Sequence, residues 1–291
     1  MLKSLLLFPV RFFVFLALGF LSACLPQPAL QGELHGQLNW QGEVHLQGNV
    51  ILAEDVVLTI APGTKVVFLP LDPSLDDFSE HPYFPGSELI VRGQIIAKGT
   101  AEAPIRFQYI DPDSEPGSWG GVNIEESKRA IFDHCIFRQA DSAVHARESW
   151  VVVENSLFTE NLVGIRFNST NILIEKNLLH NNGAAIRFHF GSPVICKNEI
   201  RNNDKGLFIT SDPRDYTIEN NSFLNNSPYQ VSLGEAVPDT VFLQKNYWGE
   251  ETAETLPSKL YDGRLDKWLG TVDFMPMRVA PDPDVGIRWN R

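Results

Sequence analysis

Short apolar segments separated by small polar turns run through the middle of the chain, and they recur with a nearly fixed step. Residues 164–183, GIRFNSTNILIEKNLLHNNG, contain the segments IRF, ILI and NLL, and residues 185–204 repeat this pattern as AIRFHFGSPVICKNEIRNND. The step is 21 residues in the centre and lengthens to 23 and 25 residues near the end, in the turn-like stretches SDPRDY and GEAVPD. This periodicity predicts an all-β solenoid, in which stacked coils bury apolar residues that one coil could not bury alone.

Several columns of the repeat support the same register. A small-residue column, two apolar columns and two polar columns follow one another in constant order: Ala143, Gly164, Ala185 and Gly206; Phe132, Val153, Ile174, Ile195, Ile218 and Leu243; Cys135, Ser156, Asn177, Asn198, Asn221 and Asn246; Phe137, Phe158, Leu179, Ile200, Phe223 and Trp248; Asn161, Asn182, Asn203 and Asn226. Asparagine is unfavourable within strands, but at a bend its amide can bond to the asparagine one coil away. We therefore expect a structural ladder, not ligands, at Asn177, Asn198, Asn221 and Asn246.

Segments outside the central repeat carry a family resemblance. GNVILAEDVVLTIAPGTKVVF, ELIVRGQIIAKGTAEAPIRF and SWGG resemble the opening of right-handed parallel β-helix proteins, and Asn246-Tyr247-Trp248-Gly249 followed by GTVDFMP resembles their closing segment. The chain is thus similar, over roughly residues 44–276, to the family that includes pectate lyases and NosD-like proteins. The resemblance implies the fold and leaves the activity open, because this fold hosts lyases, hydrolases, epimerases and non-catalytic binders.

These patterns divide the chain into four parts. We expect a signal peptide over residues 1–23, a lipidated N-terminus, linker and cap over 24–43, a β-helix over 44–250, and a C-terminal cap and tail over 251–291. Residues 31–50 are expected to cover the first coil, and AETLPSKLYDG suggests a short helical turn in the C-terminal cap. An insertion over residues 69–86, rich in Pro, Asp and aromatic residues, interrupts the early repeats and is a candidate functional loop.

The N-terminus indicates export and lipid anchoring. An apolar run follows Lys3 and Arg11, and Leu21-Ser22-Ala23-Cys24 resembles the lipobox of bacterial lipoproteins, in which the cysteine carries lipid. An ordinary secretory signal and a retained membrane anchor are the alternatives. The lipoprotein resemblance implies lipidation at Cys24, attachment to the cell envelope and, because residue 25 is Leu, sorting to the outer membrane on its periplasmic or surface side.

Charge and cysteine positions narrow the picture. Without Lys3 and Arg11 the chain has 22 basic and 36 acidic residues, a net charge of −14, which disfavours nucleic acid as a partner. Cys135 and Cys196 lie three coils apart, about 14 Å along the axis, whereas a disulfide needs Cα atoms within about 7 Å. We expect two free thiols, with Cys135 buried, in a monomeric protein.

One outward face of the solenoid holds the candidate site. If Ile165 and Phe167 point into the core, Arg166 and Asn168 point outward, and the outward columns read Asn123, His145, Arg166, Arg187 and Phe208, with Glu125, Arg147, Asn168, His189 and Thr210 beside them. Six of these residues form a candidate ligand-binding patch: His145, Arg147, Arg166, Asn168, Arg187 and His189. By resemblance, this strand face is where pectate lyases bind acidic sugar chains, and guanidinium groups suit carboxylates. The alternative is a solvated face whose charges pair with Glu125, Glu148 or Asp212.

Three functions remain open at this stage. The first is a non-catalytic envelope lipoprotein that binds a polysaccharide or a partner protein. The second is a polysaccharide lyase or epimerase acting on acidic glycans, and the third is a passive spacer. The columns offer no paired carboxylates for a glycosidase, and no calcium cage, other metal site or cofactor is expected. Two acidic turns are interpreted as solvated, and three aromatics as exposed surfaces for sugar stacking: Asp111, Asp113 and Glu115; Asp72, Asp76 and Asp77; Tyr83, Phe84 and Phe208.

Overall fold

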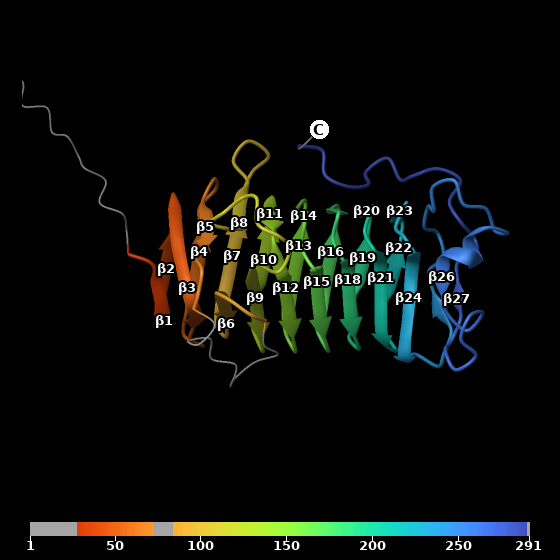
Figure 1. The fold of residues 1–291 in the computed structure, drawn as a ribbon, viewed down its shortest axis with the longest axis horizontal. Coiled ribbons are helices and arrows are strands. Elements are labelled where there is room, and N and C mark those ends of the chain that lie inside the picture. Colours follow the sequence, from red (N-terminus) through yellow and green to blue (C-terminus); the bar gives the residue numbers. More distant parts are fainter. Residues whose placement is uncertain (1–27, 73–83, 290–291) are drawn as a thin grey trace, which may run out of the picture.

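The computed structural model describes residues 28–72 and 84–289. They form a right-handed parallel β-solenoid of about 9 turns with about 22 residues per turn, as the sequence pattern predicts. The coils stack along one long axis, from β1 at one end to the region of β26 and β27 at the other (Figure 1). None of the described residues forms a helix long and apolar enough to span a bilayer.

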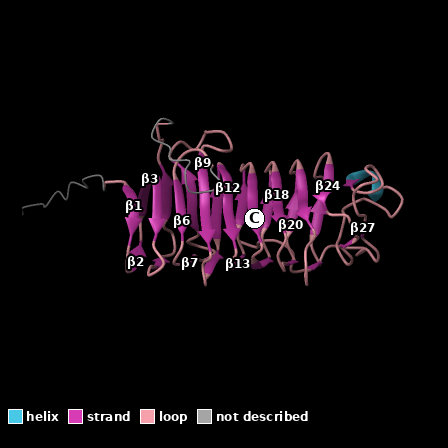
Figure 2. Cartoon of the chain, turned by 90° about the horizontal axis from the view of Figure 1, so that it is seen from below, coloured by secondary structure: helices cyan, strands magenta, loops and turns pink. Residues whose placement is uncertain are grey.

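Each regular coil contributes one strand to each of three faces, and all neighbouring strands pair in parallel (Figure 2). We call the face that carries the candidate patch the first face. Its strands are β1 (Leu30–Leu34), β3 (Glu43–Leu52), β6 (Glu88–Val91), β9 (Trp119–Glu125), β12 (Ala140–Arg147), β15 (Val163–Asn168), β18 (Ala184–His189), β21 (Lys205–Ser211), β24 (Tyr229–Ala236) and β26 (Leu260–Tyr261).

The other two faces follow the same coil order. The second face contains β2 (Gln37–Trp40), β4 (Val57–Ile60), β7 (Gln94–Lys98), β10 (Ala130–Asp133), β13 (Trp150–Glu154), β16 (Asn171–Glu175), β19 (Val194–Cys196) and β22 (Thr217–Glu219). The third contains the first half of β3, then β5 (Lys65–Phe68), β8 (Ile105–Tyr109), β11 (Cys135–Arg138), β14 (Leu157–Thr159), β17 (Leu178–His180), β20 (Glu199–Arg201) and β23 (Ser222–Leu224). Near the end, β25 (Val241–Phe242) pairs with β27 (Val272–Asp273), and a 3₁₀ helix, η2, spans Leu256–Lys259.

Identical residues of successive coils stack on one another inside the solenoid. Phe107, Phe137 and Phe158 form a continuous ring stack with centroid separations of 4.6 and 4.8 Å, and Phe167 stacks on Phe188 at 4.8 Å. The spacing matches the separation of adjacent strands, about 4.8 Å, because each ring sits one coil above the next. Each 21-residue step in the sequence therefore corresponds to a translation of one coil along the axis.

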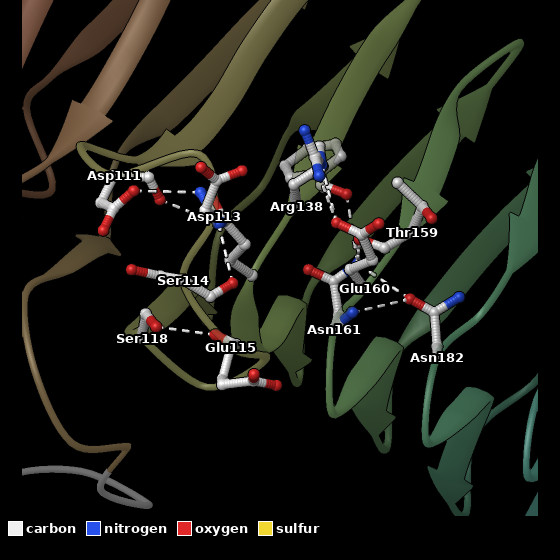
Figure 3. Close-up of polar contacts among 12 residues, drawn as sticks. Asp111, Asp113, Ser114, Glu115, Ser118, Arg138, Thr159, Glu160, Asn161 and Asn182 are labelled. Atoms are coloured by element: carbon white, nitrogen blue, oxygen red, sulfur yellow. Dashed lines mark hydrogen bonds and ion pairs between the residues drawn. The ribbon is translucent and has the colours of Figure 1, made fainter.

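The expected asparagine ladder is present and fully buried. The side-chain oxygen of Asn198 accepts hydrogen bonds from the backbone N–H and side-chain amide of Asn177, each at 3.0 Å, and the pattern continues to Asn221 and Asn246. A second ladder joins Asn161 to Asn182 (Figure 3) and continues to Asn203 and Asn226. The left-handed backbone angles occur one residue before each ladder position, as at Lys176 and Lys197, and not at the asparagines themselves. The amide, rather than tolerance of positive φ, explains the asparagine columns.

The N-terminal end differs from the division expected from the sequence, whereas the C-terminal segment packs against the last coils and contains the expected short helical turn, η2. Parallel strand pairing begins at β1 and β2, so residues 30–43 already form part of a coil and the solenoid starts before residue 44. At the other end, Leu256, Leu260 and Phe274 pack into the core beside the last coils. The final segment then runs back along the solenoid (Figure 1), where the Trp289 indole N–H donates to the Asn155 carbonyl at 2.8 Å.

The cysteines are placed as expected within the described part of the chain. Cys135 and Cys196 are free, with Cys135 buried and Cys196 half-buried. Burial, followed by the nearby Glu175 charge, raises the pKa of Cys196 to about 11. Cys24 and the expected signal peptide over residues 1–23 lie outside the described residues.

Candidate functional site

The strand register of the first face brings the predicted patch together. His145 pairs with Asn123 on one side and Arg166 on the other, and Arg166 pairs in turn with Arg187. Arg147, Asn168 and His189 align in the neighbouring column. One predicted neighbour is displaced: a register shift after Phe188 places Ser211, not Thr210, opposite His189.

A cavity of about 280 Å³ opens among these strands, and all six predicted residues line it together with Phe167, Phe188 and Thr210. The phenylalanines belong to the core, so they form the floor of the cavity, while the polar and charged groups form its walls. His189 Nδ1 lies 3.3 Å from the Thr210 hydroxyl, and Asn168 accepts a hydrogen bond from Ser169 at 2.8 Å. We call this space the cationic cavity.

Two arginines in the cationic cavity have no ion-pair partner in the described part of the chain. Arg166 lies over the Phe84 ring at 5.3 Å, and Arg187 lies over Phe208 at 5.2 Å. Burial and, next, the Arg187 charge lower the pKa of Arg166. Adjacent strands lie about 4.8 Å apart, and two like charges at that separation would repel by about 1 kcal/mol in water and about 3 kcal/mol at an effective dielectric constant of 20. An anion between them would remove that cost.

Asp141 is the acidic group that moderates this pair, and the column analysis missed it. Burial raises its pKa, while its hydrogen bond with Ser142 and the charges of Arg166 and Arg187 act in the opposite direction. Asp141 precedes the outward column on β12, so the periodic pattern did not include it. Its position near two arginines becomes visible only when the coils are stacked.

Arg147 differs from the other two arginines because carboxylates surround it. Its guanidinium lies 4.0 Å from Glu125 and 3.9 Å from Glu126, and Glu125 also pairs with Arg92 at 3.2 Å. The charge pairing that the solvated-face alternative expected is therefore present between Arg147 and Glu125, although Glu125 is buried and not solvated. Glu148 and Asp212 make no ion pair with any residue that the structure describes.

A buried polar chain positions His145. Asn123 donates to Glu88 at 2.5 Å, and the Asn123 side-chain oxygen lies 3.0 Å from His145 Nδ1. Because the Asn123 amide nitrogen is used on Glu88, its oxygen faces the imidazole as an acceptor, so His145 carries a proton on Nδ1. Asn123, Glu125 and His145 were expected on a solvated surface, but all three are less than 10% exposed because residues near the insertion cover this part of the face.

Phe84 shows this covering most clearly. It was expected as an exposed sugar-stacking ring, but it is 6% exposed and packs edge-on against His145 at 5.3 Å. Its backbone N–H donates to Glu88 at 3.1 Å, so one residue of the insertion is joined to the polar chain and to Arg166. Phe208 is partly exposed, as expected, and Tyr83 lies outside the described residues.

The acidic turn at residues 111–115 is held by local contacts. In the loop shown in Figure 3, the Asp111 side chain accepts from the Asp113 N–H at 3.0 Å, and Ser118 donates to the Glu115 carbonyl at 2.7 Å. Gln139 fixes the loop through two further bonds to its backbone. Asp76 and Asp77 lie outside the described residues. Within residues 28–72 and 84–289, no group of three His, Cys, Asp or Glu side chains is placed to hold a metal ion.

The fold agrees with one comparison to known proteins. Residues 117–241, which contain the cationic cavity, match the family model for a right handed beta helix region. The chain is a right-handed parallel β-helix repeat protein, as its resemblance to that family implies. No curated protein and no solved structure matches it.

Proposed function

We propose that this protein is a non-catalytic, lipid-anchored component of a bacterial cell envelope that binds an acidic polysaccharide, or an acidic surface of a partner protein, in the cationic cavity. One observation carries the proposal: Arg166 and Arg187 stack in register over a cavity and make no ion pair within the described chain. Their mutual repulsion is offset when carboxylates bind between them, and arginine binds carboxylates through two parallel hydrogen bonds.

The overall charge makes this local patch selective. A chain with a formal net charge of −12 repels polyanions over most of its surface, so acidic ligands are favoured only where cations gather. The strands repeat about every 4.8 Å along the axis. A linear polymer with repeated carboxylates can therefore contact Arg166 and Arg187 with successive groups, whereas a single small anion occupies only one position.

A second candidate function is a polysaccharide lyase or epimerase, and the lowered pKa of Arg166 favours it. Either reaction removes a proton from the carbon next to a uronate carboxyl group, and neutralisation of that carboxyl by cations makes the proton easier to remove. In a lyase the adjacent C–O bond then breaks, and the product is an unsaturated uronate. A passive spacer, the third hypothesis, predicts no ligand.

A glycan array separates the three functions. The full chain in mild detergent is applied to acidic and neutral oligosaccharides, and ultraviolet absorbance reports any unsaturated uronate. The test variant is Arg166→Ala/Arg187→Ala, and its control, Arg129→Ala/Arg214→Ala, removes the same charge from exposed positions outside the cavity. Binding to acidic glycans that is lost only in the test variant supports the proposal; binding that survives both changes contradicts it. Rising absorbance identifies a lyase. The absence of glycan binding excludes an acidic polysaccharide as the ligand and leaves an acidic partner protein or a passive spacer.

Lipid anchoring rests on the lipobox-like residues 21–24 and has its own test. Cells expressing the full chain should yield a mature protein in the membrane fraction whose N-terminal Cys24 carries acyl groups by mass spectrometry. Cys24→Ala should abolish the acyl mass and block cleavage before residue 24. An unmodified Cys24 in a membrane-bound protein would instead indicate a retained apolar anchor.

A further inference from the structure

A second cavity adjoins the cationic cavity on the same face. It has a volume of about 350 Å³ and lies over β21, β24 and β26, lined by Lys205, Phe208, Tyr229, Ser232, Glu235 and Asp266, among others. The two cavities share a wall: Arg187 lines the first, Phe208 lines the second, and the guanidinium carbon of Arg187 is 5.2 Å from the Phe208 ring centre. We call the second space the aromatic cavity.

The lining of the aromatic cavity differs from that of its neighbour, although it also includes one cation, Lys205. Tyr229 and Tyr261 form a tilted pair with ring centres 5.4 Å apart, and Phe208 supplies a third ring. Glu235 and Asp266 contribute carboxylates where the cationic cavity has arginines and histidines. Carboxylates repel an anionic group and accept hydrogen bonds from hydroxyls, while aromatic rings pack against apolar faces of a ligand.

Ser232 gives an independent indication of a polar ligand. It stands in register between Phe208 and Tyr261 in the outward column and is 3% exposed. Its hydroxyl makes no hydrogen bond to any residue that the structure describes. Buried hydroxyls in native proteins almost always have a partner, so an unpaired one on a cavity wall suggests a group from outside the chain.

We propose that the aromatic cavity binds a neutral sugar ring of the same glycan whose acidic units occupy the cationic cavity. The rings pack against the apolar face of the sugar, and Ser232, Glu235 and Asp266 bond to its hydroxyls. Arg166 and Ser232 stand three strands apart, about 14 Å along the axis, so one ligand reaches both cavities only if it is an oligosaccharide. This inference rests on the proposed binding function and adds a direction: the acidic part lies toward β12 and the neutral part toward β26.

The test compares three classes of oligosaccharide on the full chain in detergent: acidic, neutral, and acidic with a neutral end. The variants are Tyr229→Ala/Tyr261→Ala and the milder Ser232→Ala, which keeps the aromatic packing and decides the outcome if the tyrosine variant fails to fold. Trp150→Ala is the control because Trp150 is an exposed aromatic residue on the second face. Circular dichroism confirms that each variant is folded.

The acidic oligosaccharides with a neutral end should bind more tightly than purely acidic ones, and the cavity variants should remove that advantage, about tenfold in dissociation constant. Purely acidic glycans should bind the wild type, the two aromatic-cavity variants and Trp150→Ala alike. Neutral oligosaccharides should bind the Arg166→Ala/Arg187→Ala variant but not Tyr229→Ala/Tyr261→Ala. This comparison tests the aromatic cavity even if the cationic cavity has no acidic ligand. Equal binding of the mixed and acidic classes, or a mixed-class advantage that survives in the cavity variants, overturns the inference. Preference for apolar peptides over sugars would overturn it as well.

Discussion

The buried ladder at Asn198 allows the sharpest prediction about stability. The Asn198 amide nitrogen donates to the carbonyls of Ile174 and Cys196 at 2.8 and 3.0 Å and to the Asn221 side chain at 2.9 Å. Its oxygen accepts from the backbone N–H and the side-chain amide of Asn177. Asn198→Ala removes all of these bonds. The Asn177 side-chain amide still bonds to Val153, but its buried backbone N–H loses its partner.

The cost follows from the groups left unpaired. A buried polar group without a partner costs about 1–3 kcal/mol, and Asn198→Ala leaves the Asn177 N–H unpaired and weakens two carbonyl contacts, so we expect a loss of about 2–5 kcal/mol. Asn198→Ser should cost about half as much, because Ser156 occupies the same column and its hydroxyl both accepts from Cys135 and donates to Glu154.

Urea unfolding followed by circular dichroism measures the series, with Asn171→Ala as the control. Asn171 lies exposed on β16 and should change stability by less than about 0.5 kcal/mol. The expected order of the unfolding midpoints is wild type, Asn198→Ser, Asn198→Ala. An Ala variant no less stable than Asn171→Ala, or Ser and Ala variants of equal stability, would refute the idea that side-chain bonds between coils hold the stack.

Three further predictions concern charge and thiols. Arg166→Gln removes a charge repulsion that salt screens, so its gain in melting temperature over the wild type should be larger at low salt than in 1 M salt. Thermal melts at both salt concentrations check this, and a difference in melting temperature that does not depend on salt contradicts it. The folded-state pKa of Asp141 is raised above its ordinary value of 3.8, so ionised Asp141 destabilises the fold at neutral pH. Asp141→Asn should therefore raise the unfolding free energy near pH 7 and make no difference below about pH 3, where the carboxyl is protonated. A gain in stability that persists at pH 3 would rule this out. Because the pKa of Cys196 is about 11 and Cys135 is buried, iodoacetamide at pH 8 should label neither thiol until urea is added, and rapid labelling of the native protein would show that Cys196 is not protected as described.

The repeat made most of the fold and the central arrangement of the site predictable from the sequence. A translation of 21 residues places Arg166 beside Arg187 and Asn177 beside Asn198, because parallel coils convert sequence period into spatial register. The same reasoning missed the irregularity after Phe188, where an extra residue on β21 pairs His189 with Ser211 in the strand register, although the Thr210 side chain still contacts His189.

Contacts from non-repeating segments could not be predicted in this way. Phe84 comes from the insertion and covers His145, and Trp289 returns from the C-terminus to Asn155. Neither segment has a periodic pattern that fixes its place, so the burial of His145 and the Glu88–Asn123 chain behind it appear only in three dimensions. The contact of Phe84, near the end of the 69–86 insertion, with His145 and Arg166 was not foreseen.

The central claim is that the stacked pair Arg166 and Arg187 binds carboxylates. The most direct test measures the affinity of oligosaccharides bearing two or more carboxylates for the wild type, for Arg166→Ala/Arg187→Ala and for Arg129→Ala/Arg214→Ala. Loss of two hydrogen-bonded charge contacts at about 1.5–3 kcal/mol each should weaken binding by about 100-fold or more in the first variant and leave the second near wild type. An acidic glycan that binds both variants with the same affinity, or a wild type that binds none, would contradict the account.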